Sequence, residues 1–213
     1  MTPVRTTVIL CLAFVTIVVG MLVYSVTRTP VLSDEQLREQ GVFILPTPRE
    51  LGDFELTSHR GEPFTVADLR GRWSFVFFGF TNCPDICPIA MSVLAQARRR
   101  LAEESPDSVS DFQGVLVTVD PERDDRETLA SYVESFSPTF LGARGDRAAT
   151  ANLATAVNVA FAKVPGNGDG YQVDHTGNIV IVNPRGHYHG FVKLPHQADT
   201  IVATFRTLQE RWR

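Results

Sequence analysis

The first long apolar run lies close to the N-terminus. Residues 8–26 contain no charged side chain, and this length is near the roughly 20 residues that a helix needs to cross a bilayer. The apolar part of a cleaved signal peptide runs only about 7–15 residues and ends at a small-x-small site, which this segment lacks in clear form. The pattern therefore predicts a tail at residues 1–7 and an uncleaved transmembrane helix at residues 8–26.

The segment after the apolar run is polar. Residues 27–50 include an acidic stretch and, further on, Pro46 and Pro48, a composition that is typical of a linker. We therefore predict a short tether over 27–50, with the folded domain beginning near Leu51 and extending to residue 213.

From residue 51 onward, strand and helix patterns alternate. Residues 73–80 (WSFVFFGF) are continuously apolar, as a strand buried on both faces should be. Apolar positions then recur at helical spacing from Ile86 to Leu101, and residues 112–119 return to strand character. These segments predict a β-α-β unit around a central strand.

The rest of the chain completes a known order of elements. We expect helices near 129–136 and 148–157, strands at 179–182 and 188–194, and a final amphipathic helix at 201–212. A β-α-β half followed by a β-hairpin and a helix is the order of a thioredoxin-like domain. The sequence therefore predicts an α/β, thioredoxin-like domain at residues 51–213, with an additional helical segment between its halves.

Composition and charge narrow the possible functions. The chain has 213 residues, 44% of them hydrophobic, which leaves room for one ordinary domain besides the apolar segment. The first 28 residues contain two basic residues, Arg5 and Arg28, and no acidic ones. The rest of the chain therefore holds 18 of the 20 basic side chains and all 24 acidic ones, and is net negative. Binding to nucleic acid needs cations that neutralise phosphates, so we predict no nucleic-acid partner.

Two of the three cysteines follow the predicted central strand. The turn at residues 81–88 reads TNCPDICP, and proline is tolerated only in the first turn of a helix. Cys83 and Cys87 are therefore expected to bracket a helix start, where free N–H groups and the helix dipole stabilise a thiolate. Both thiols should be reactive. Cys11 lies within the apolar segment, where packing is its simplest role.

The spacing of Cys83 and Cys87 leaves two functions open. Residues at i and i+4 place their Cβ atoms about 5–6 Å apart on one helix face, where two thiolates can bind one metal ion at about 2.3 Å each. A disulfide is also possible at this separation, although the thioredoxin redox pair has the spacing C-x-x-C. The pattern thus predicts a metal site or a redox-active disulfide.

Two thiolates alone would leave a metal ion undercoordinated, so the five histidines are the next candidates. His59 and His196 occupy positions where an exposed turn or capping role suffices. His187 and His189 alternate along a strand and are more simply solvated. His175 directly precedes a strand, on the loop that faces the cysteine turn in this fold, and is the best candidate for a third ligand.

Three segments in this order resemble the Sco/SenC copper chaperones of cytochrome c oxidase assembly. They are GFTNCPDICP at 79–88, VDPERD at 119–124 and VDHT at 173–176. The resemblance covers the chain from about Leu51 to the C-terminus, and it implies a single anchor, a tether and a thioredoxin-like domain.

The resemblance implies that Cys83, Cys87 and His175 are copper ligands and that Asp120 lies beside them. Asn82 departs from the family, which often has His before the first cysteine. Soft thiolates select Cu(I), and an added imidazole also accepts Cu(II), so the site could hold either state. Zinc would fit these residue types too, but a structural zinc site is normally closed by four protein ligands.

The resemblance also implies partners and a location. Copper would come from a donor protein and pass to the dinuclear copper centre in a subunit of cytochrome c oxidase, outside the cytoplasm. No Arg-rich amphipathic presequence precedes the apolar run, which favours a single-pass protein of a bacterial inner membrane with its domain in the periplasm. We predict a metallochaperone rather than an enzyme, which could also reduce the acceptor's cysteines.

Two alternatives remain from the sequence alone. A membrane-tethered thiol-disulfide oxidoreductase would use Cys83 and Cys87 without a metal. A structural domain that only binds a partner would be favoured if the two thiols proved buried and unreactive.

Overall fold

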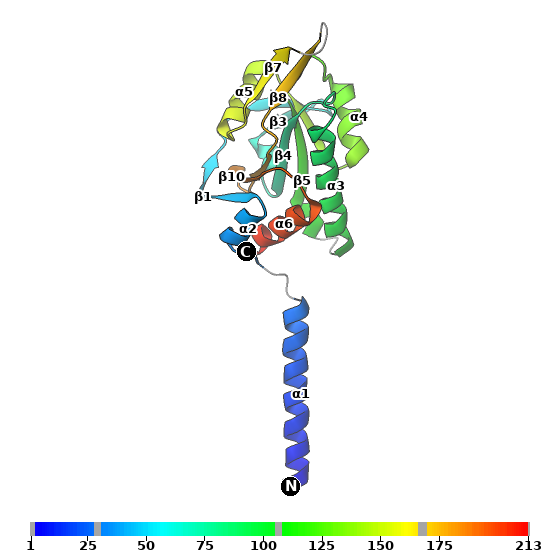
Figure 1. The fold of residues 1–213 in the computed structure, drawn as a ribbon, viewed down its shortest axis with the longest axis vertical. Helices are drawn as coiled ribbons and strands as arrows, with labels where there is room; N and C mark the ends of the chain where they lie inside the picture. The colour runs from blue at the N-terminus through cyan, green and yellow to red at the C-terminus, as the bar shows by residue number, and fades with distance from the viewer. Residues whose placement is uncertain (1–2, 28–30, 105–107, 166–169, 213) are drawn as a thin grey trace. The chain divides into compact units, whose positions relative to one another are not determined.

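The computed structural model describes residues 3–27, 31–104, 108–165 and 170–212 (Figure 1). The chain divides into two units, one of residues 1–31 with 206–213 and the other Leu32–Phe205. Helix α1 spans Pro3–Thr27 and contains an apolar segment, Val4–Leu22, with a mean hydropathy of 2.2. This segment of 19 residues is long and apolar enough to cross a membrane. A signal sequence meets the same criterion, so an uncleaved anchor stays a prediction.

The remaining elements alternate between strands and helices along the chain. In order they are α2 (Asp34–Glu39), β1 (Val42–Glu50), β2 (Glu55–Ser58), β3 (Pro63–Thr65), η1 (Val66–Leu69), β4 (Trp73–Gly79), α3 (Ile86–Glu104), η2 (Ser108–Asp111), β5 (Phe112–Thr118), α4 (Arg126–Phe136), β6 (Leu141–Arg144), α5 (Arg147–Ala156), β7 (Phe161–Pro165), β8 (Tyr171–His175), β9 (Ile179–Val182), β10 (His187–Val192) and α6 (Ala198–Trp212). Eight strands form one sheet in the order β1-β10-β9-β4-β5-β6-β2-β3, and β7 and β8 pair separately.

The centre of the sheet is the predicted β-α-β unit. Strands β4 and β5 are parallel, with Trp73 opposite Phe112, and every residue of both strands is buried. Helix α3 connects them, and β9 pairs antiparallel with the other side of β4. Continuous burial explains why residues 73–79 are apolar without alternation, except for Ser74, whose buried hydroxyl donates to the Gln113 side chain at 3.1 Å.

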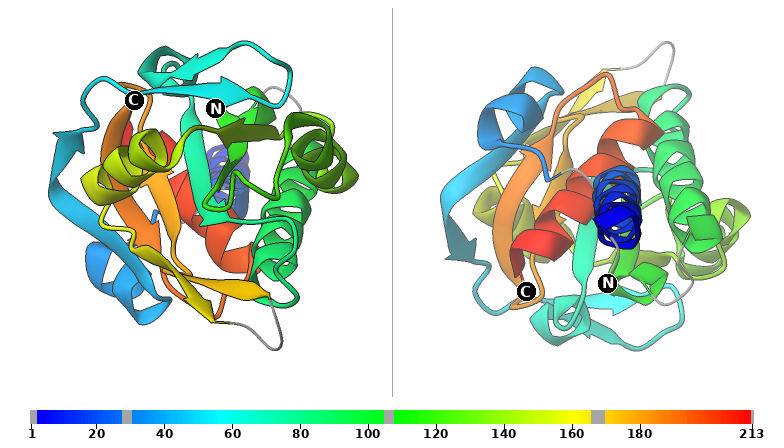
Figure 2. Two further views of the ribbon diagram at one scale, coloured as in Figure 1. Left: turned by 90° about the horizontal axis from the view of Figure 1, so that it is seen from above. Right: turned by 90° about the horizontal axis from the view of Figure 1, so that it is seen from below.

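Helices pack on both faces of this sheet (Figure 2). On one face Phe75 stacks on Phe112, which meets Phe205 of α6 edge to face. On the other face Val76 and Phe78 line a small apolar gap that α5 helps to close. The α/β thioredoxin-like fold is thereby confirmed, with the first turn of α3 at the end of β4.

The folded unit begins earlier than the sequence predicts. Strand β1 pairs antiparallel with β10, with Val42 opposite Val192, and Leu37 of α2 and Val42 are fully buried. The predicted tether at 27–50 is therefore wrong from Leu32 onward. The reason is that Pro46 and Pro48 read as linker residues, yet proline is allowed in an edge strand such as β1.

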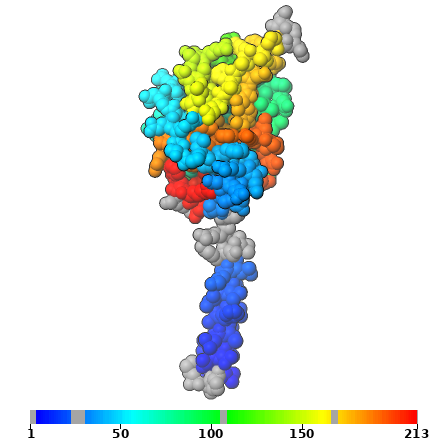
Figure 3. All heavy atoms as spheres, turned by 60° about the vertical axis from the view of Figure 1, so that its left-hand side comes forward, coloured from blue at the N-terminus to red at the C-terminus, as the bar shows by residue number. Residues whose placement is uncertain are grey.

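The segment between the two halves of the fold is also richer in strands than predicted. Besides helices α4 and α5, it contains strand β6 and the hairpin formed by β7 and β8. This hairpin forms part of the molecular surface, in yellow in Figure 3. His175 is the last residue of β8, so it lies on a strand end and not on the predicted loop.

Candidate metal centre

The two cysteines lie where the chain passes from β4 into α3. Cys83 is half-buried in the turn before the helix, and Cys87 is fully buried in its first turn. The backbone N–H groups of Asp85 and Cys87 help to lower the pKa of the Cys83 thiol. This confirms that the pair brackets the helix start, and both are free thiols in the structure.

A buried carboxylate anchors the beginning of this turn. Asp124 is fully buried and accepts a hydrogen bond from the Thr81 hydroxyl at 2.6 Å and from the Thr81 backbone N–H at 3.1 Å. The hydroxyl of Thr118, at the end of β5, donates to the same carboxylate at 2.6 Å. Asp124 therefore ties the cysteine turn to the neighbouring strand.

Asp124 is a site residue that sequence reasoning missed. Asp120, from the same VDPERD segment, was expected beside the ligands. Asp120 is also fully buried, and its partners are the Arg123 side chain and the Tyr171 hydroxyl, the latter at 2.7 Å. The sequence held no signal for Asp124, because a requirement for a hydrogen-bond partner follows from burial, which only the structure shows.

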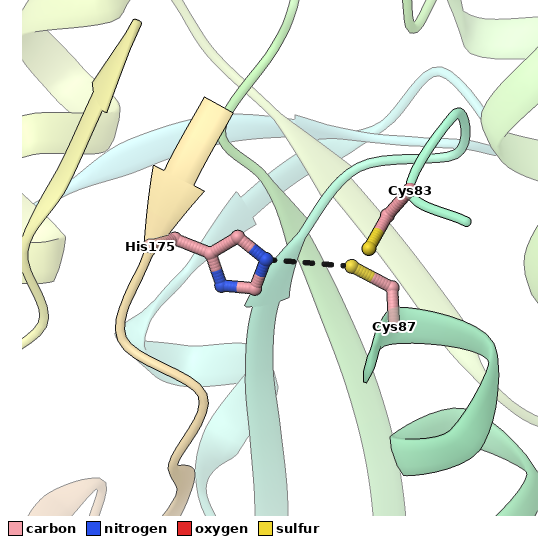
Figure 4. Close-up of side chains that lie close together, drawn as sticks. All are labelled: Cys83, Cys87 and His175. Atoms are coloured by element: carbon pink, nitrogen blue, oxygen red, sulfur yellow. Dashed lines mark hydrogen bonds between the residues drawn. The ribbon is translucent and has the colours of Figure 1, made fainter. Parts of the chain in front are cut away.

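His175 reaches the cysteines from the end of β8 (Figure 4). Its imidazole packs edge to face against two aromatic rings. The centroid of the imidazole lies 5.7 Å from the ring centroid of Phe77 and 5.9 Å from that of Phe80. Its Nδ1 lies 3.2 Å from the carbonyl oxygen of Thr176, to which it can donate a hydrogen bond. Nε2 then faces the sulfur of Cys87 at 3.5 Å. A metal-binding histidine is typically oriented in this way, with its other nitrogen donating to a carbonyl.

The three predicted ligands come together in space. The sulfur atoms of Cys83 and Cys87 and a ring nitrogen of His175 all lie within 4.8 Å of one another. Two sulfur atoms bound to one ion at about 2.3 Å each can be at most about 4.6 Å apart. In a trigonal arrangement the two sulfur atoms would be about 4 Å apart, so a shift of less than an ångström would let one ion contact all three atoms. Among the described residues no other such group of His, Cys, Asp and Glu side chains occurs.

The two thiols differ strongly in acidity. A hydrogen bond from the Cys87 thiol, against the opposing effect of burial, lowers the pKa of Cys83 to about 4, and His175 contributes in the same direction. The pKa of Cys87 is raised, first by this hydrogen bond and then by burial. At neutral pH the pair therefore holds one thiolate, on the more exposed cysteine, and one thiol.

The other histidines have structural surroundings. His59 is buried, contrary to the expected exposed position, and its Nδ1 accepts a hydrogen bond from the Gly142 N–H at 3.0 Å. His196 is also buried, and its Nε2 donates to the Gly177 carbonyl at 2.8 Å. Burial lowers the pKa of His196. The half-buried His189 packs edge to face against Trp73.

Comparison with known proteins identifies relatives. The sequence model of the SCO1/SenC family matches residues 45–210. The protein named SCO2 homolog, mitochondrial, of Mus musculus is 40% identical over 156 residues, which are 73% of this chain and 60% of the mouse protein. The chain therefore spans about three fifths of that relative's length.

Solved structures show the same fold. Arabidopsis thaliana ScoI with copper bound is 30% identical, with a TM-score of 0.69 over 75% of this chain and 98% of that chain. BsSco, described as a member of the Sco family of cytochrome c oxidase assembly proteins and studied for a disulfide switch, is 22% identical, with a TM-score of 0.61 over 78% and 96% of the two chains. At that identity, the BsSco structure supports the fold alone.

Proposed function

This chain belongs to the SCO1/SenC family, and we propose that it is a membrane-anchored copper chaperone that binds one copper ion through Cys83, Cys87 and His175. The observation that carries the proposal is the convergence of these three ligand atoms within 4.8 Å. Copper bound to the Arabidopsis thaliana relative supports the choice of metal. Two thiolates suit Cu(I), and the imidazole extends the site to Cu(II).

The site is suited to handing its metal on. Cys87 is fully buried, whereas Cys83 and His175 are half-buried, so an incoming ligand reaches the ion from the side of those two residues. A surface hollow of about 380 Å³ adjoins His175, and its other lining residues are Ala160, Phe161, Ala162, Asp174 and Thr176. Three protein ligands leave a position open for exchange. We propose that a copper donor loads this site and that it loads the dinuclear copper centre of cytochrome c oxidase.

The decisive experiment is a copper titration of the reduced full chain in detergent micelles. The parent should bind one equivalent of Cu(I) or Cu(II). His175→Ala should weaken Cu(II) binding most and Cu(I) binding less, since both thiolates remain. His187→Ala, which changes a half-buried histidine of β10, is the matched control. Parent-like binding of both oxidation states by His175→Ala would remove His175 from the site.

A second function for the same pair is reduction of a partner's disulfide. It is favoured by the lowered pKa of Cys83, about 4, which keeps the accessible thiol ionised at neutral pH. The Cys83 thiolate would attack the partner's disulfide and release one partner thiolate. Cys87 would then break the mixed disulfide, so that this chain ends with a Cys83–Cys87 disulfide and the partner with two reduced cysteines. His175→Ala should leave this reaction intact, which separates it from copper binding.

The location is part of the proposal. Helix α1 is long and apolar enough to be an anchor, and the copper centre of the acceptor lies outside the cytoplasm in the family. We therefore place the folded unit in the periplasm of a bacterial cell. A reporter fused after the last residue should be active only in that compartment, and activity confined to the cytoplasm would contradict the orientation.

A further inference from the structure

The hairpin that carries His175 is not part of the main sheet. Strands β7 and β8 pair only with each other within the described part of the chain, with Phe161 opposite His175. At the base of the hairpin, Thr176 donates its N–H to the Ala160 carbonyl at 2.9 Å, a bond that is again internal to the hairpin. An isolated two-stranded hairpin is marginally stable in water at best. Other contacts must therefore fix its position relative to the cysteines.

A buried carboxylate in the loop after β5 supplies such contacts. Asp120 is fully buried and accepts hydrogen bonds from the Tyr171 hydroxyl, at 2.7 Å, and from Nε of Arg123. Arg123 in turn donates through Nη1 to the backbone carbonyl of Tyr171 at 3.2 Å. These three residues, which we call the Asp120 clamp, link the first residue of β8 to the loop by two hydrogen bonds, and a third bond joins Arg123 to Asp120 within the loop.

The clamp also reaches the ring that packs on His175. The Arg123 guanidinium carbon lies 4.1 Å from the centroid of the Tyr171 ring and 5.6 Å from that of Phe80. Phe80 meets the imidazole of His175 edge to face. One guanidinium therefore contacts both the hairpin and the side chain that holds the imidazole, and cation–π contacts of this kind strengthen when they are desolvated.

We propose that Asp120, Arg123 and Tyr171 are positioning residues that set the distance between His175 and the two thiols. The clamp is the connection that brings the hairpin's imidazole to the cysteine turn, so loosening it withdraws one ligand and leaves the two thiolates in place. The copper measurements below rest on the proposed function, whereas the measurement on the metal-free chain does not.

The hairpin offers a matched control outside the clamp. Lys163 of β7 lies 4.3 Å above the Tyr171 ring and forms an ion pair with Glu122 of the same loop. The Glu122 side chain is 67% exposed, whereas the Asp120 side chain is fully buried. Exposed ion pairs contribute little to stability, so Glu122→Gln should leave the hairpin in place.

The first measurement is hydrogen exchange of the amides of β7 and β8 in the reduced, metal-free full chain. Tyr171→Phe removes one hydrogen bond to a charged group and keeps the ring, so these amides should exchange about tenfold faster. Arg123→Lys keeps the charge and loses the planar contact with two rings, and should act in the same direction. Amides of β4 and β5 should keep the parent's rates in both variants, and Glu122→Gln should match the parent throughout.

The second measurement is a double-mutant cycle with His175→Ala. Tyr171→Phe should weaken Cu(II) binding about tenfold in the parent and should have no further effect once His175 is absent. An equal effect of Tyr171→Phe on Cu(II) affinity with and without His175 would overturn the proposal. The proposal would also be overturned if the hairpin amides of Tyr171→Phe exchanged at the same rates as those of Glu122→Gln. If the parent bound no copper, the proposed function would fail, while the exchange rates would still decide whether the clamp positions the hairpin.

Discussion

Gly79, the last residue of β4, has no room for a side chain. A Cβ atom at this position would lie 2.9 Å from the Cys87 sulfur and 2.9 Å from Cε1 of Phe77, whereas ordinary contacts are 3.4–4 Å. Cys87 and Phe77 are both fully buried, so neither can turn into solvent to make space. Gly79→Ala should therefore push the Cys87 sulfur, the ring of Phe77 or both by about half an ångström or more.

The size of this effect follows from the cost of overpacking. An extra methyl group in a packed core typically costs about 1–3 kcal/mol, and in a domain of this size each kcal/mol lowers the melting temperature by about 2–4 °C. The expected loss is therefore roughly 2–12 °C for Gly79→Ala. Copper affinity should fall in addition, because ligands must keep their positions to within about half an ångström.

Gly114→Ala separates the two effects. Gly114 lies on the adjacent strand β5, and a Cβ there would lie 2.6 Å from the ring of Phe140. Both variants should lose thermal stability in differential scanning calorimetry, but only Gly79→Ala should weaken Cu(I) binding in a competition titration. Equal copper affinities for the two variants would refute the reasoning that the missing side chain at Gly79 makes room for the sulfur.

Four further predictions concern the same turn. Alkylation of Cys83 by iodoacetamide should change little between about pH 5 and pH 8, because its pKa of about 4 leaves it ionised throughout; a rate that rises about tenfold per pH unit would contradict this. The Cys83 thiol keeps its proton up to about pH 9 in the unfolded chain, but loses it above about pH 4 in the folded chain. The contribution of Cys83 to the stability of the reduced domain should therefore be fully present above about pH 9 and decline as the pH falls toward about 4. Thermal melts at several pH values would detect this decline. Asp124→Asn replaces a carboxylate that accepts hydrogen bonds from Thr81 and Thr118, and should lower the free energy of unfolding by about 1–3 kcal/mol in a urea titration. The chain oxidised to the Cys83–Cys87 disulfide should bind no copper at this site.

The centre of the fold could be predicted because its signals are local. The apolar run of β4 and the helical spacing of apolar residues after Ile86 each lie in a single stretch of sequence. The buried positions of each stretch can therefore be predicted from its own residues. The prolines beside Cys83 and Cys87 mark the helix start for the same reason. These features sufficed to place both thiols at the carboxyl end of the central strand.

The parts that were missed depend on contacts between distant residues. The bond from Thr81 to Asp124 spans 43 positions, and no local pattern distinguishes Asp124 from Asp120. Apart from the buried Val173, the positions of β7 and β8 are half-buried or exposed rather than an apolar run, so these strands resemble loop sequence. The place of this hairpin in the structure depends on the side chains that contact it.

The prolines of β1 have a consequence for how copies of this chain meet one another. Strand β1 forms one edge of the eight-stranded sheet and carries Pro46 and Pro48, and β3 forms the other edge and begins at Pro63. An open edge strand is a template onto which another chain can add its own strand, and proline interrupts the row of donors that such addition requires. Both edges are thus protected against intermolecular sheet growth, so copies of the chain at high local concentration can stay separate.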